Sequence, residues 1–380
     1  MDFQLNETEK LIQQTARDFA TRELAPTAAR RDAEGTFPLA ELKKMAELGL
    51  MGVNVPEKWG GTEAGVVAYA LAMMEISRAC AATAVTMAVT NMVAEVICKF
   101  GTSEQIQRQV PRITSGEYSC GAFALSEPHC GSDASALRTS ARRSERGWVL
   151  NGTKQFITSG DHAGVIVVWA RTGGPGHRGI SAFLVEKGTP GMSIGTVEKK
   201  MGLKGSTTVQ LVFEDAEIPA EALLDEENRG FRIAMVALDG GRIGVGAQAV
   251  GIAQAALDEA VRYSRERQAF GAPLANKQAI QWMLADSATE LEAARLLVLQ
   301  AADCKGRGLP FTRQASMAKL FASEAANRIC ARAFQVHGGY GYIKEYPIER
   351  LVRDCRITTI YEGTSEVQRM VIARSLLDNA

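Results

Sequence analysis

The stretch "GWVLNGTKQFIT", Gly147 to Thr158, lies in the middle of a chain whose two ends have the pattern of helices. Short apolar or β-branched runs flank its Asn151-Gly152 pair. Such a pair between two runs of this kind is the strongest short-range signal of a β-hairpin, so we predict a turn there. The runs "VIVVWART", "ISAFLVEK" and "TTVQLVFEDAEIP" follow and are also typical of strands. Residues 117–227 are therefore predicted to form a β-domain.

On both sides of this segment the hydrophobic period returns to that of helices. Residues 1–116 are predicted to form a helical domain, with a Gly/Pro-containing loop at 54–65, and residues 228–380 a second one. Helix, sheet and helix in three blocks, without alternating βαβ units, indicate an α+β fold with separate α and β domains. The glycines of "DGGRIGVG" and "HGGYGYIKEY" follow no strand and give no Gly-x-Gly-x-x-Gly, which argues against a Rossmann domain. We interpret the first of these stretches as small residues that allow close helix packing.

Composition excludes several classes of function. The 380 residues are 46% hydrophobic, and 43 basic residues balance 43 acidic ones, so no net field attracts nucleic acid or an anionic membrane. Seven cysteines lack a Cys-x-x-Cys and four histidines lack ligand spacing, so neither a disulfide framework nor a metal site is predicted. A reducing compartment, the cytoplasm, fits this pattern best.

Two segments must be distinguished from a signal peptide and from a membrane-spanning helix. The N-terminus has Asn6 and Glu9 at the spacing of a capping box and lacks the basic start of a signal peptide, so it is predicted to be a folded helix. Residues 79–94 carry no charge, but their threonines and asparagine suit a membrane span poorly. We expect this segment to be a buried core helix, without a membrane span.

Near the C-terminus, Glu362 stands beside Gly363, just before a predicted helix start at Thr364 or Ser365. One interpretation is that its carboxylate complements the positive end of the helix dipole. The other is that it performs chemistry. The residues around Glu362 do not by themselves decide between these interpretations.

A set of motifs in fixed order bears on this choice. They are "FALSEPHCGSD" (123–133), "NGTKQFIT" (151–158), "GLKGSTT" (202–208), "LDGGRIGVGAQAVGIAQ" (238–254), "RQAFG" (267–271), "QVHGGYGY" (335–342) and "IYEGTSE" (360–366). Together they resemble the acyl-CoA dehydrogenase family, most closely its short-chain, butyryl-CoA type branch, and the resemblance covers essentially the whole chain.

The resemblance implies an N-terminal helical domain, a middle β-domain and a C-terminal four-helix bundle, with FAD bound at the domain junction. The first group of implied FAD contacts, here called the β-domain set, comprises Phe123, Leu125, Ser126, Gly131, Ser132, Phe156, Ile157 and Thr158. Ser132 is also implied to lie near the CoA moiety. Glycine suits position 131 because a Cβ would block the approach of chain and ligand.

The chain departs from the family pattern at three of these positions or their neighbours. Phe156 stands where tryptophan is usual, which keeps an aromatic face but loses the indole donor. His129 and Cys130 stand where small residues are usual. Because the sequence suggests no partner cluster for His129, we interpret it as an exposed or satisfied loop residue and not as a catalyst.

A second group of implied FAD contacts, here called the bundle set, belongs to a neighbouring subunit. It comprises Arg267, Phe270, Gln278, Gln335, Val336, Gly338 and Gly339. This sharing implies a homotetramer built as a dimer of dimers. Thr364 and Glu366 are implied to close over the adenosine and phosphate part of the cofactor.

By the same resemblance, Glu362 is the base that takes the α-proton of an acyl-CoA, and its backbone N–H helps to polarise the thioester carbonyl. The β-hydride passes to the flavin, and the electrons go on to an electron-transfer flavoprotein. The implied substrate contacts are Ser132, Asp239, Gly241, Arg242 and Gly363. A structural ion pair between Arg242 and a carboxylate such as Asp239 is the alternative for that arginine.

Other functions remain open beside this one. An acyl-CoA oxidase-like flavoenzyme would use oxygen, and a nitroalkane oxidase would use aspartate where this chain has Glu362. A non-catalytic interaction protein would have little need of the base. The sequence leaves the acyl group undecided among straight, branched and alicyclic chains.

Overall fold

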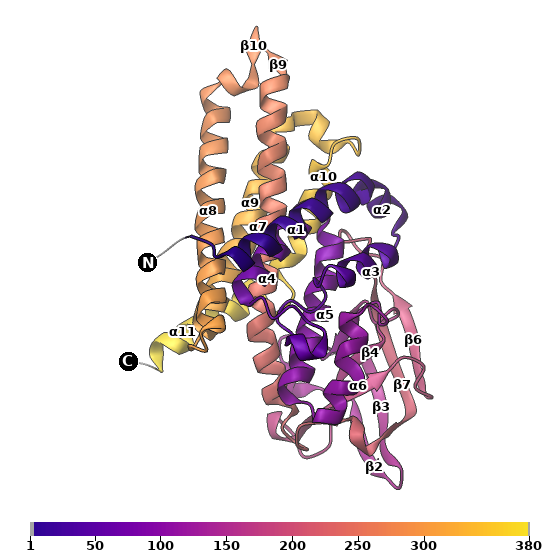
Figure 1. The fold of residues 1–380 in the computed structure, drawn as a ribbon. Helices are drawn as coiled ribbons and strands as arrows, with labels where there is room; N and C mark the ends of the chain where they lie inside the picture. Colours follow the sequence, from indigo (N-terminus) through magenta and orange to yellow (C-terminus); the bar gives the residue numbers. More distant parts are fainter. Residues whose placement is uncertain (1–3, 379–380) are drawn as a thin grey trace.

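The computed structural model describes residues 4–378 and has helices at both ends of the chain and a sheet between them (Figure 1). The N-terminal helices are α1 (Glu7–Phe19), α2 (Ala28–Glu34), α3 (Leu39–Glu47), α4 (Val66–Ala79), α5 (Ala81–Phe100) and α6 (Ser103–Thr114). The capping box predicted for the first helix is confirmed, because Asn6 Oδ1 accepts from Glu9 N at 2.8 Å and Glu9 Oε2 accepts from Asn6 N at 2.9 Å.

The middle of the chain forms the strands of a single large sheet. They are β1 (Gly121–Ala124), β2 (Ser140–Ser144), β3 (Gly147–Thr158), β4 (Val165–Arg171), β5 (Ile180–Glu186), β6 (Met192–Val197), β7 (Thr208–Pro219) and β8 (Leu223–Leu224). The strand order is β6-β7-β3-β2-β4-β5-β8, with β1 parallel to β4. The predicted β-domain, and with it the α+β fold class, is confirmed.

The predicted turn at Asn151-Gly152 is wrong. Both residues lie inside β3, and the turn that joins β2 to β3 falls at residues 145–146, between the paired Ser144 and Gly147. Gly152 has φ 143°, and the pairing of β3 with β7 is irregular there. A Cβ at Gly152 would lie 2.7 Å from Thr139 Cα. The pair therefore marks a bulge, because β3 is held on both edges by β2 and β7 and cannot turn back.

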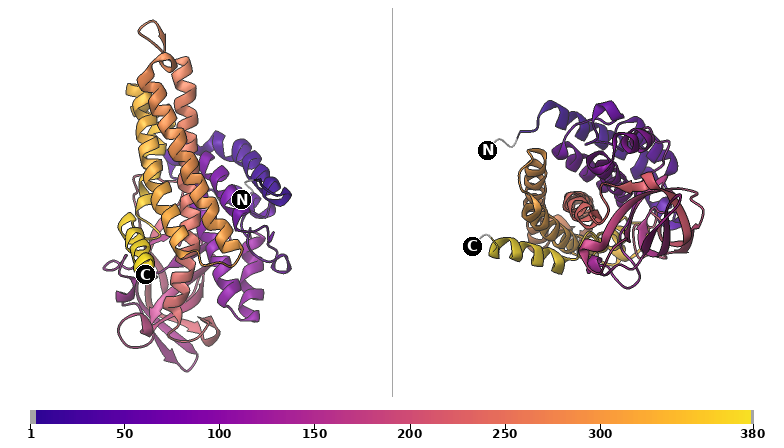
Figure 2. Two further views of the ribbon diagram at one scale, coloured as in Figure 1. Left: turned by 90° about the vertical axis from the view of Figure 1, so that its left-hand side faces the viewer. Right: turned by 90° about the horizontal axis from the view of Figure 1, so that it is seen from below.

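The C-terminal part contains the longest helices. Its elements are α7 (Gly230–Glu266), β9 (Gln268–Ala269), β10 (Ala272–Pro273), α8 (Gln278–Gly306), α9 (Thr312–His337), α10 (Ile348–Arg356) and α11 (Ser365–Leu377). Helices α7, α8 and α9 lie side by side, and the short β9–β10 hairpin projects beyond the rest of the molecule (Figure 2). The expected C-terminal helical domain is confirmed.

Helix α5 is the apolar segment that we expected in the core. It is long and apolar enough to cross a membrane, but 83% of its most apolar window is buried inside the protein, as in a core helix. It packs against α7, which also packs against α4. A Cβ at Gly244 would lie 2.6 Å from Tyr69 Oη, and one at Gly251 would lie 2.3 Å from Met74 O. Small residues on α7 thus allow close helix packing, as predicted.

Polar contacts join the three parts of the chain. Arg353 of α10 donates to both oxygens of Asp32 at 2.7 and 3.1 Å, and to the Met201 carbonyl at 3.1 Å. The buried Trp169 of β4 donates through Nε1 to the Gly230 carbonyl at 2.7 Å, at the start of α7. These bonds fix the helices and the sheet relative to one another around the junction.

The bulge generates a first prediction. Gly152→Ala should lower the free energy of unfolding by about 1–3 kcal/mol, because the new Cβ meets Thr139 and the backbone has a φ that side chains rarely adopt. Urea unfolding checks the value. Gly174→Ala is the matched control, since a Cβ there meets nothing within 4 Å. Equal unfolding midpoints for the two variants would contradict the argument.

Candidate active site

Glu362 lies on a turn between α10 and α11 with an unusual backbone. Its φ is 55° and that of Gly363 is 89°, so both residues are in the left-handed region. Thr364 then caps α11 by accepting from Val367 N at 3.3 Å, which confirms the predicted polar cap. A non-glycine residue at positive φ is uncommon and persists only where its surroundings hold it.

Two buried side chains hold this turn by its carbonyl groups. Lys319 of α9 donates through Nζ to the Gly363 carbonyl at 2.7 Å. Gln368 of α11 donates through Nε2 to the carbonyls of Glu362 and Gly363, at 3.1 and 2.9 Å. Both side chains are fully enclosed. Neither residue was singled out from the sequence, where a lysine on a helix is usually solvated.

The carboxyl group of Glu362 points toward α7. A Cβ at Gly241 would lie 2.9 Å from Glu362 Oε2 and 3.2 Å from Met92 Sδ. Although the residue as a whole is only half-buried, its Oε2 is enclosed and has no hydrogen-bond partner within the described residues. Burial raises the pKa of Glu362 to about 7, against the opposing effect of the Arg242 and Lys319 cations. The Glu362 carboxyl group therefore lies against α7, and Thr364 is the residue that caps α11.

Arg242 on α7 forms the ion pair that the sequence left as an alternative. Its Nη1 lies 2.6 Å from Asp239 Oδ1 and donates to Ser316 Oγ at 3.2 Å. Its Nε is enclosed without a partner in the described part of the chain. Asp239 also accepts from Thr312 at 2.5 Å. Arg242 is therefore a buried, partly paired cation whose Nε–H has no partner within residues 4–378.

A partly exposed ion pair lies beside the neighbouring Gly240 of α7. Lys305 Nζ lies 2.5 Å from Glu95 Oε2, and Asn54 Nδ2 donates to Glu95 Oε1 at 2.8 Å. A Cβ at Gly240 would lie 3.0 Å from Lys305 Nζ. Two adjacent glycines of α7 thus lie beside charged groups: Gly240 beside Lys305, and Gly241 beside Glu362.

In the β-domain set, the segment from Phe123 to Glu127 is fixed on β3 by a buried ion pair. Lys154 Nζ lies 2.7 Å from Glu127 Oε1 and donates to the Leu125 carbonyl at 3.2 Å. The Ser126 carbonyl accepts from Gln155 N at 2.9 Å. Sequence reasoning missed Glu127 and Lys154, although both lie within the quoted motifs, because a lysine in a strand is usually solvated.

At the end of the same strand, the predicted cofactor residues differ in exposure. Phe156 has φ 60° and is 65% exposed, while Ile157 is buried and Thr158 is half-buried. Gly131 and Ser132 are exposed, and a Cβ at Gly131 meets nothing within 4 Å. The β-domain set therefore exposes the ring of Phe156 and the uncovered backbone at Gly131.

The expectation that His129 has no partner cluster is wrong. Donor atoms of Glu127, His129 and Cys130 all lie within 4.8 Å of one another. Both Glu127 oxygens are already engaged, because Oε1 accepts from Lys154 and from Thr139 N at 2.9 Å, and Oε2 accepts from Arg138 N at 2.7 Å. His129 itself is an exposed loop residue, as predicted, with Nε2 3.2 Å from the Ala136 carbonyl. The occupied carboxylate makes the cluster a poor metal site.

The bundle set lies at the opposite end of the long helices from α11 (Figure 1). Arg267 follows α7, with its guanidinium 5.2 Å from the ring centre of Tyr340. Phe270, at the tip of the hairpin, is 96% exposed, and Gln278 and Gln335 are exposed as well. Gly338, with φ 57°, and Gly339 end α9 in exposed backbone. Within one protomer, the structure does not bring these residues to Glu362 or to the β-domain set.

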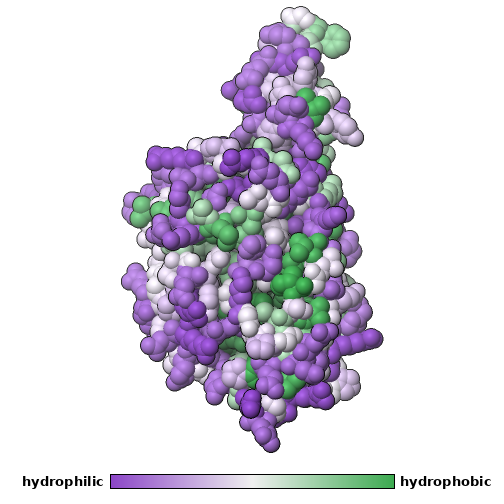
Figure 3. Space-filling view, turned by 90° about the vertical axis from the view of Figure 1, so that its right-hand side faces the viewer, coloured by the Kyte–Doolittle hydropathy of each residue, from purple (hydrophilic) through white to green (hydrophobic). Residues whose placement is uncertain are grey.

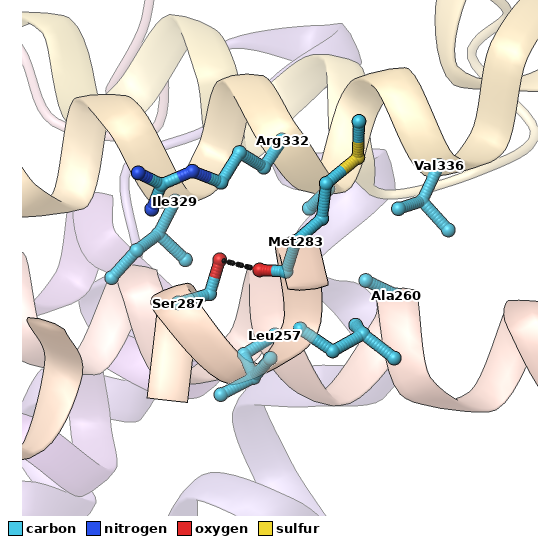
Figure 4. A pocket seen from close by; sticks show the side chains of 9 residues that line it. Leu257, Ala260, Met283, Ser287, Ile329, Arg332 and Val336 are labelled. Atoms are coloured by element: carbon cyan, nitrogen blue, oxygen red, sulfur yellow. Dashed lines mark hydrogen bonds between the residues drawn. The ribbon is translucent and has the colours of Figure 1, made fainter. Parts of the chain in front are cut away.

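Val336, predicted with the bundle set, is buried in a crevice between α7, α8 and α9 (Figure 4). The crevice is mostly apolar, and its hydroxyl, that of Ser287, donates to the Met283 carbonyl at 2.7 Å. It is a packing defect of the bundle and holds no reactive group.

Comparison with known proteins agrees with this arrangement along the whole chain. Profiles of the N-terminal, middle and C-terminal domains of acyl-CoA dehydrogenase match residues 6–117, 122–216 and 228–377. The chain is 54% identical over 376 residues to the mitochondrial short-chain specific acyl-CoA dehydrogenase of Bos taurus, covering 98% of this chain and 91% of that protein.

Two solved structures are similar over nearly their full length. Butyryl-CoA dehydrogenase from Megasphaera elsdenii superposes with a TM-score of 0.97 at 45% identity, covering 99% of this chain and 100% of that one. A chain solved in work on the electron transferring flavoprotein of Acidaminococcus fermentans has a TM-score of 0.98 at 47% identity, with the same coverage of 99% and 100%.

The buried Glu127–Lys154 pair generates a second prediction. Lys154→Met should destabilise the protein by about 3–5 kcal/mol, because it leaves the Glu127 carboxylate buried without its cation. Denaturant unfolding checks this value. Lys199→Met, on an exposed lysine, is the matched control. If Lys154→Met unfolded at the same denaturant concentration as that control, Glu127 would not depend on the ion pair.

Proposed function

The chain belongs to the acyl-CoA dehydrogenase family, and we propose that it removes the α-proton and β-hydride of a short acyl-CoA with Glu362 as the base. Members are FAD-dependent oxidoreductases of fatty acid metabolism, and this chain is of the short-chain, butyryl type. Bound FAD supplies the acceptor for the hydride, which no side chain can take. The chain's own residues must supply the base, the orientation of the thioester and the exclusion of water.

The enclosed Glu362 carboxyl group is the observation that carries this proposal. An α-proton beside a thioester is weakly acidic, so its removal needs a base stronger than an ordinary carboxylate. With its pKa raised to about 7 by burial, Glu362 is still substantially ionised at neutral pH and is a better proton acceptor than a solvated glutamate. Its Oε2, which lacks a hydrogen-bond partner among residues 4–378, is available to the substrate. A general base held in position next to the substrate contributes roughly 10²- to 10⁴-fold to the rate.

The backbone of the same residue can orient the thioester. Tyr361 N donates to the Ile357 carbonyl at 3.2 Å, whereas the following Glu362 N makes no such bond to the described backbone. A free N–H beside the base is suited to bind the carbonyl oxygen on which negative charge develops. Gly363, with no Cβ, lets the chain pass close to that group.

We propose that these residues bind the substrate because of their positions around Glu362. Gly241 leaves space between the Glu362 carboxylate and Met92, and Asp239 holds the Arg242 guanidinium beside it. The Glu95–Lys305 ion pair lies behind Gly240. Because a long apolar chain would have to displace these charged groups, the arrangement supports a short acyl group. Ser132, on an exposed loop, is proposed to contact the CoA moiety.

The cofactor residues are proposed as two groups that serve one FAD from two protomers. The β-domain set fits a flavin ring, since it combines the exposed Phe156 face with the open backbone at Gly131. The bundle set, Thr364 and Glu366 are assigned to the rest of the cofactor. Figure 3 shows apolar side chains at the projecting end of the bundle, where Phe270 is 96% exposed. An exposed aromatic at a tip far from its own site supports its burial against a second copy, in a tetramer built as a dimer of dimers.

We assign the electron acceptor to an electron-transfer flavoprotein, because a closely similar chain was solved in work on such a protein. An oxidase acting through oxygen is the alternative acceptor route. A branched or alicyclic acyl group remains the alternative substrate for the same site.

A third prediction tests the base. Glu362→Gln should retain FAD and acyl-CoA binding but lose flavin reduction by at least about 10²-fold, because an amide cannot take the α-proton. The measurement is anaerobic stopped-flow absorbance of the flavin, with a panel of straight, branched and alicyclic acyl-CoA thioesters at the concentration that saturates the wild-type protein.

Glu145→Gln is the control for that experiment, since Glu145 is exposed in the turn between β2 and β3 and belongs to no proposed site. Flavin bleaching by Glu362→Gln within tenfold of the wild-type rate would move the base to another residue. Stoichiometric hydrogen peroxide from the wild-type protein in air, at a rate matching that with an artificial electron acceptor, would instead identify an oxidase.

A fourth prediction concerns the shared cofactor. Arg267→Ala should reduce both the FAD content of the purified protein and its oligomer size, because the guanidinium is proposed to reach a cofactor held mainly by another protomer. The flavin-to-protein absorbance ratio and light scattering after size-exclusion chromatography measure the two effects. Arg307→Ala, on the exposed arginine that follows α8, is the control. A fully flavinated tetramer of Arg267→Ala would remove Arg267 from the site.

A further inference from the structure

Lys319 is a fully buried cation that the proposed mechanism does not yet use. It lies in the middle of α9 with no exposed surface, and its Nζ donates to the Gly363 carbonyl at 2.7 Å. It makes no ion pair with any carboxylate among residues 4–378. Lysine is almost never fully buried unless it is paired, because removing an ammonium group from water is costly. A side chain in this state needs an explanation beyond packing.

Holding the turn does not by itself require a positive charge. The neutral amide of Gln368 already donates to the Gly363 carbonyl at 2.9 Å, and to the Glu362 carbonyl at 3.1 Å. A second neutral donor would complete the same hydrogen bonds without the cost of burying a cation. The positive charge of the ammonium group must therefore be explained by its effect on another group, the Glu362 carboxylate.

The charged and titratable groups around Glu362 come from several helices. Arg242 faces it from α7 and Lys319 from α9, while Tyr69 of α4 and the adjacent Tyr361 are held neutral by burial, which raises the pKa of both phenols. Arg242 has the larger effect on Glu362, but it is also bound to Asp239 at 2.6 Å. Lys319 is the second cation, and among residues 4–378 no carboxylate is hydrogen-bonded to it.

The surroundings of Lys319 lead to the same pairing. Burial lowers the pKa of Lys319 to about 8, and Glu362 is the strongest opposing influence. Arg242 also lowers the pKa of Lys319, while Glu366 and Glu324 raise it more weakly than Glu362. At neutral pH the ammonium group is therefore still mostly protonated, and the carboxylate with the largest effect on it is that of Glu362.

We propose that Lys319 is a positioning residue for the Glu362 base: its ammonium group holds the Gly363 carbonyl, and with it the Glu362–Gly363 turn, while its charge keeps the enclosed carboxylate ionised. This inference rests on the proposed role of Glu362 in acyl-CoA dehydrogenation. It assigns two tasks to one side chain, and the neutral Gln368 can perform only the first.

The direction of the charge effect follows from simple electrostatics. A nearby cation favours the ionised form of a carboxyl group, so removing the Lys319 charge should raise the pKa of Glu362 above its value in the intact protein. A smaller fraction of Glu362 is then ionised at neutral pH. Because only the ionised form takes a proton, activity on the acid side should need a higher pH.

A fifth prediction separates the two tasks with a pair of variants. In Lys319→Met, the acid limb of the profile of kcat/KM against pH should move up by about one pH unit, with roughly a tenfold loss of rate below that limb. Gln368→Leu, which removes a neutral donor from the same carbonyl, should lower the rate without moving the limb. Lys319→Arg, which keeps the charge, should retain the wild-type limb.

A second readout does not depend on turnover. The infrared carboxyl band of Glu362 is identified as the one that Glu362→Gln removes, and its titration is followed in the flavin-loaded protein without substrate. Its midpoint should move to higher pH in Lys319→Met and stay in place in Gln368→Leu. Where Lys319→Met does not fold, Lys319→Gln is titrated in its place.

Two results would overturn the inference. An unchanged midpoint in the Lys319→Met or Lys319→Gln protein would show that the charge does not act on Glu362, and an equal shift in Gln368→Leu would show that geometry alone sets the pKa. A wild-type protein that reduces its flavin with none of the acyl-CoA thioesters would contradict the proposed function instead. In that case the infrared titration still decides whether Lys319 and Glu362 are coupled.

Discussion

The enclosed carboxyl group of Glu362 is the constraint on which the rest of the site depends. Taking a carboxylate out of water favours its protonated form, so burial alone would make Glu362 a strong base that is rarely ionised. The surrounding cations, Arg242 and Lys319, oppose that effect and bring its pKa to about 7. Gly241 leaves the space between the carboxyl group and Met92, which a Cβ would fill. The pKa of Glu362 thus results from a balance between desolvation and charge, both supplied by neighbouring helices.

That balance requires a backbone that does not relax. Glu362 and Gly363 both have positive φ, and their carbonyl groups are held by Lys319 and Gln368. Strain of this kind persists only where the surrounding structure over-determines it. The rigid surroundings come from the junction of the three parts of the chain, where Arg353 binds both Asp32 and the Met201 carbonyl.

The same need for a fixed frame explains the buried ion pair under the proposed flavin site. Lys154 ties Glu127 and the Leu125 carbonyl to β3, so the backbone from 123 to 127 cannot move independently of the sheet. The hairpin tip differs, because Phe270 is 96% exposed. In the proposed assembly, one protomer supplies the base and this frame, while its projecting end completes the site of another copy.

The sequence by itself determined the order of helical and β blocks, the capped first helix, the buried helix at 79–94 and the motifs that indicated the family. Each of these is read from residues a few positions apart, since helix period, strand period and caps are local properties. Tertiary structure decided the rest. Asn151-Gly152 became a bulge because neighbouring strands hold both edges of β3. Lys319 and Gly363 are 44 positions apart, and Lys305 and Glu95 are 210 apart, so only the packing of the helices brings these hydrogen-bonded pairs together.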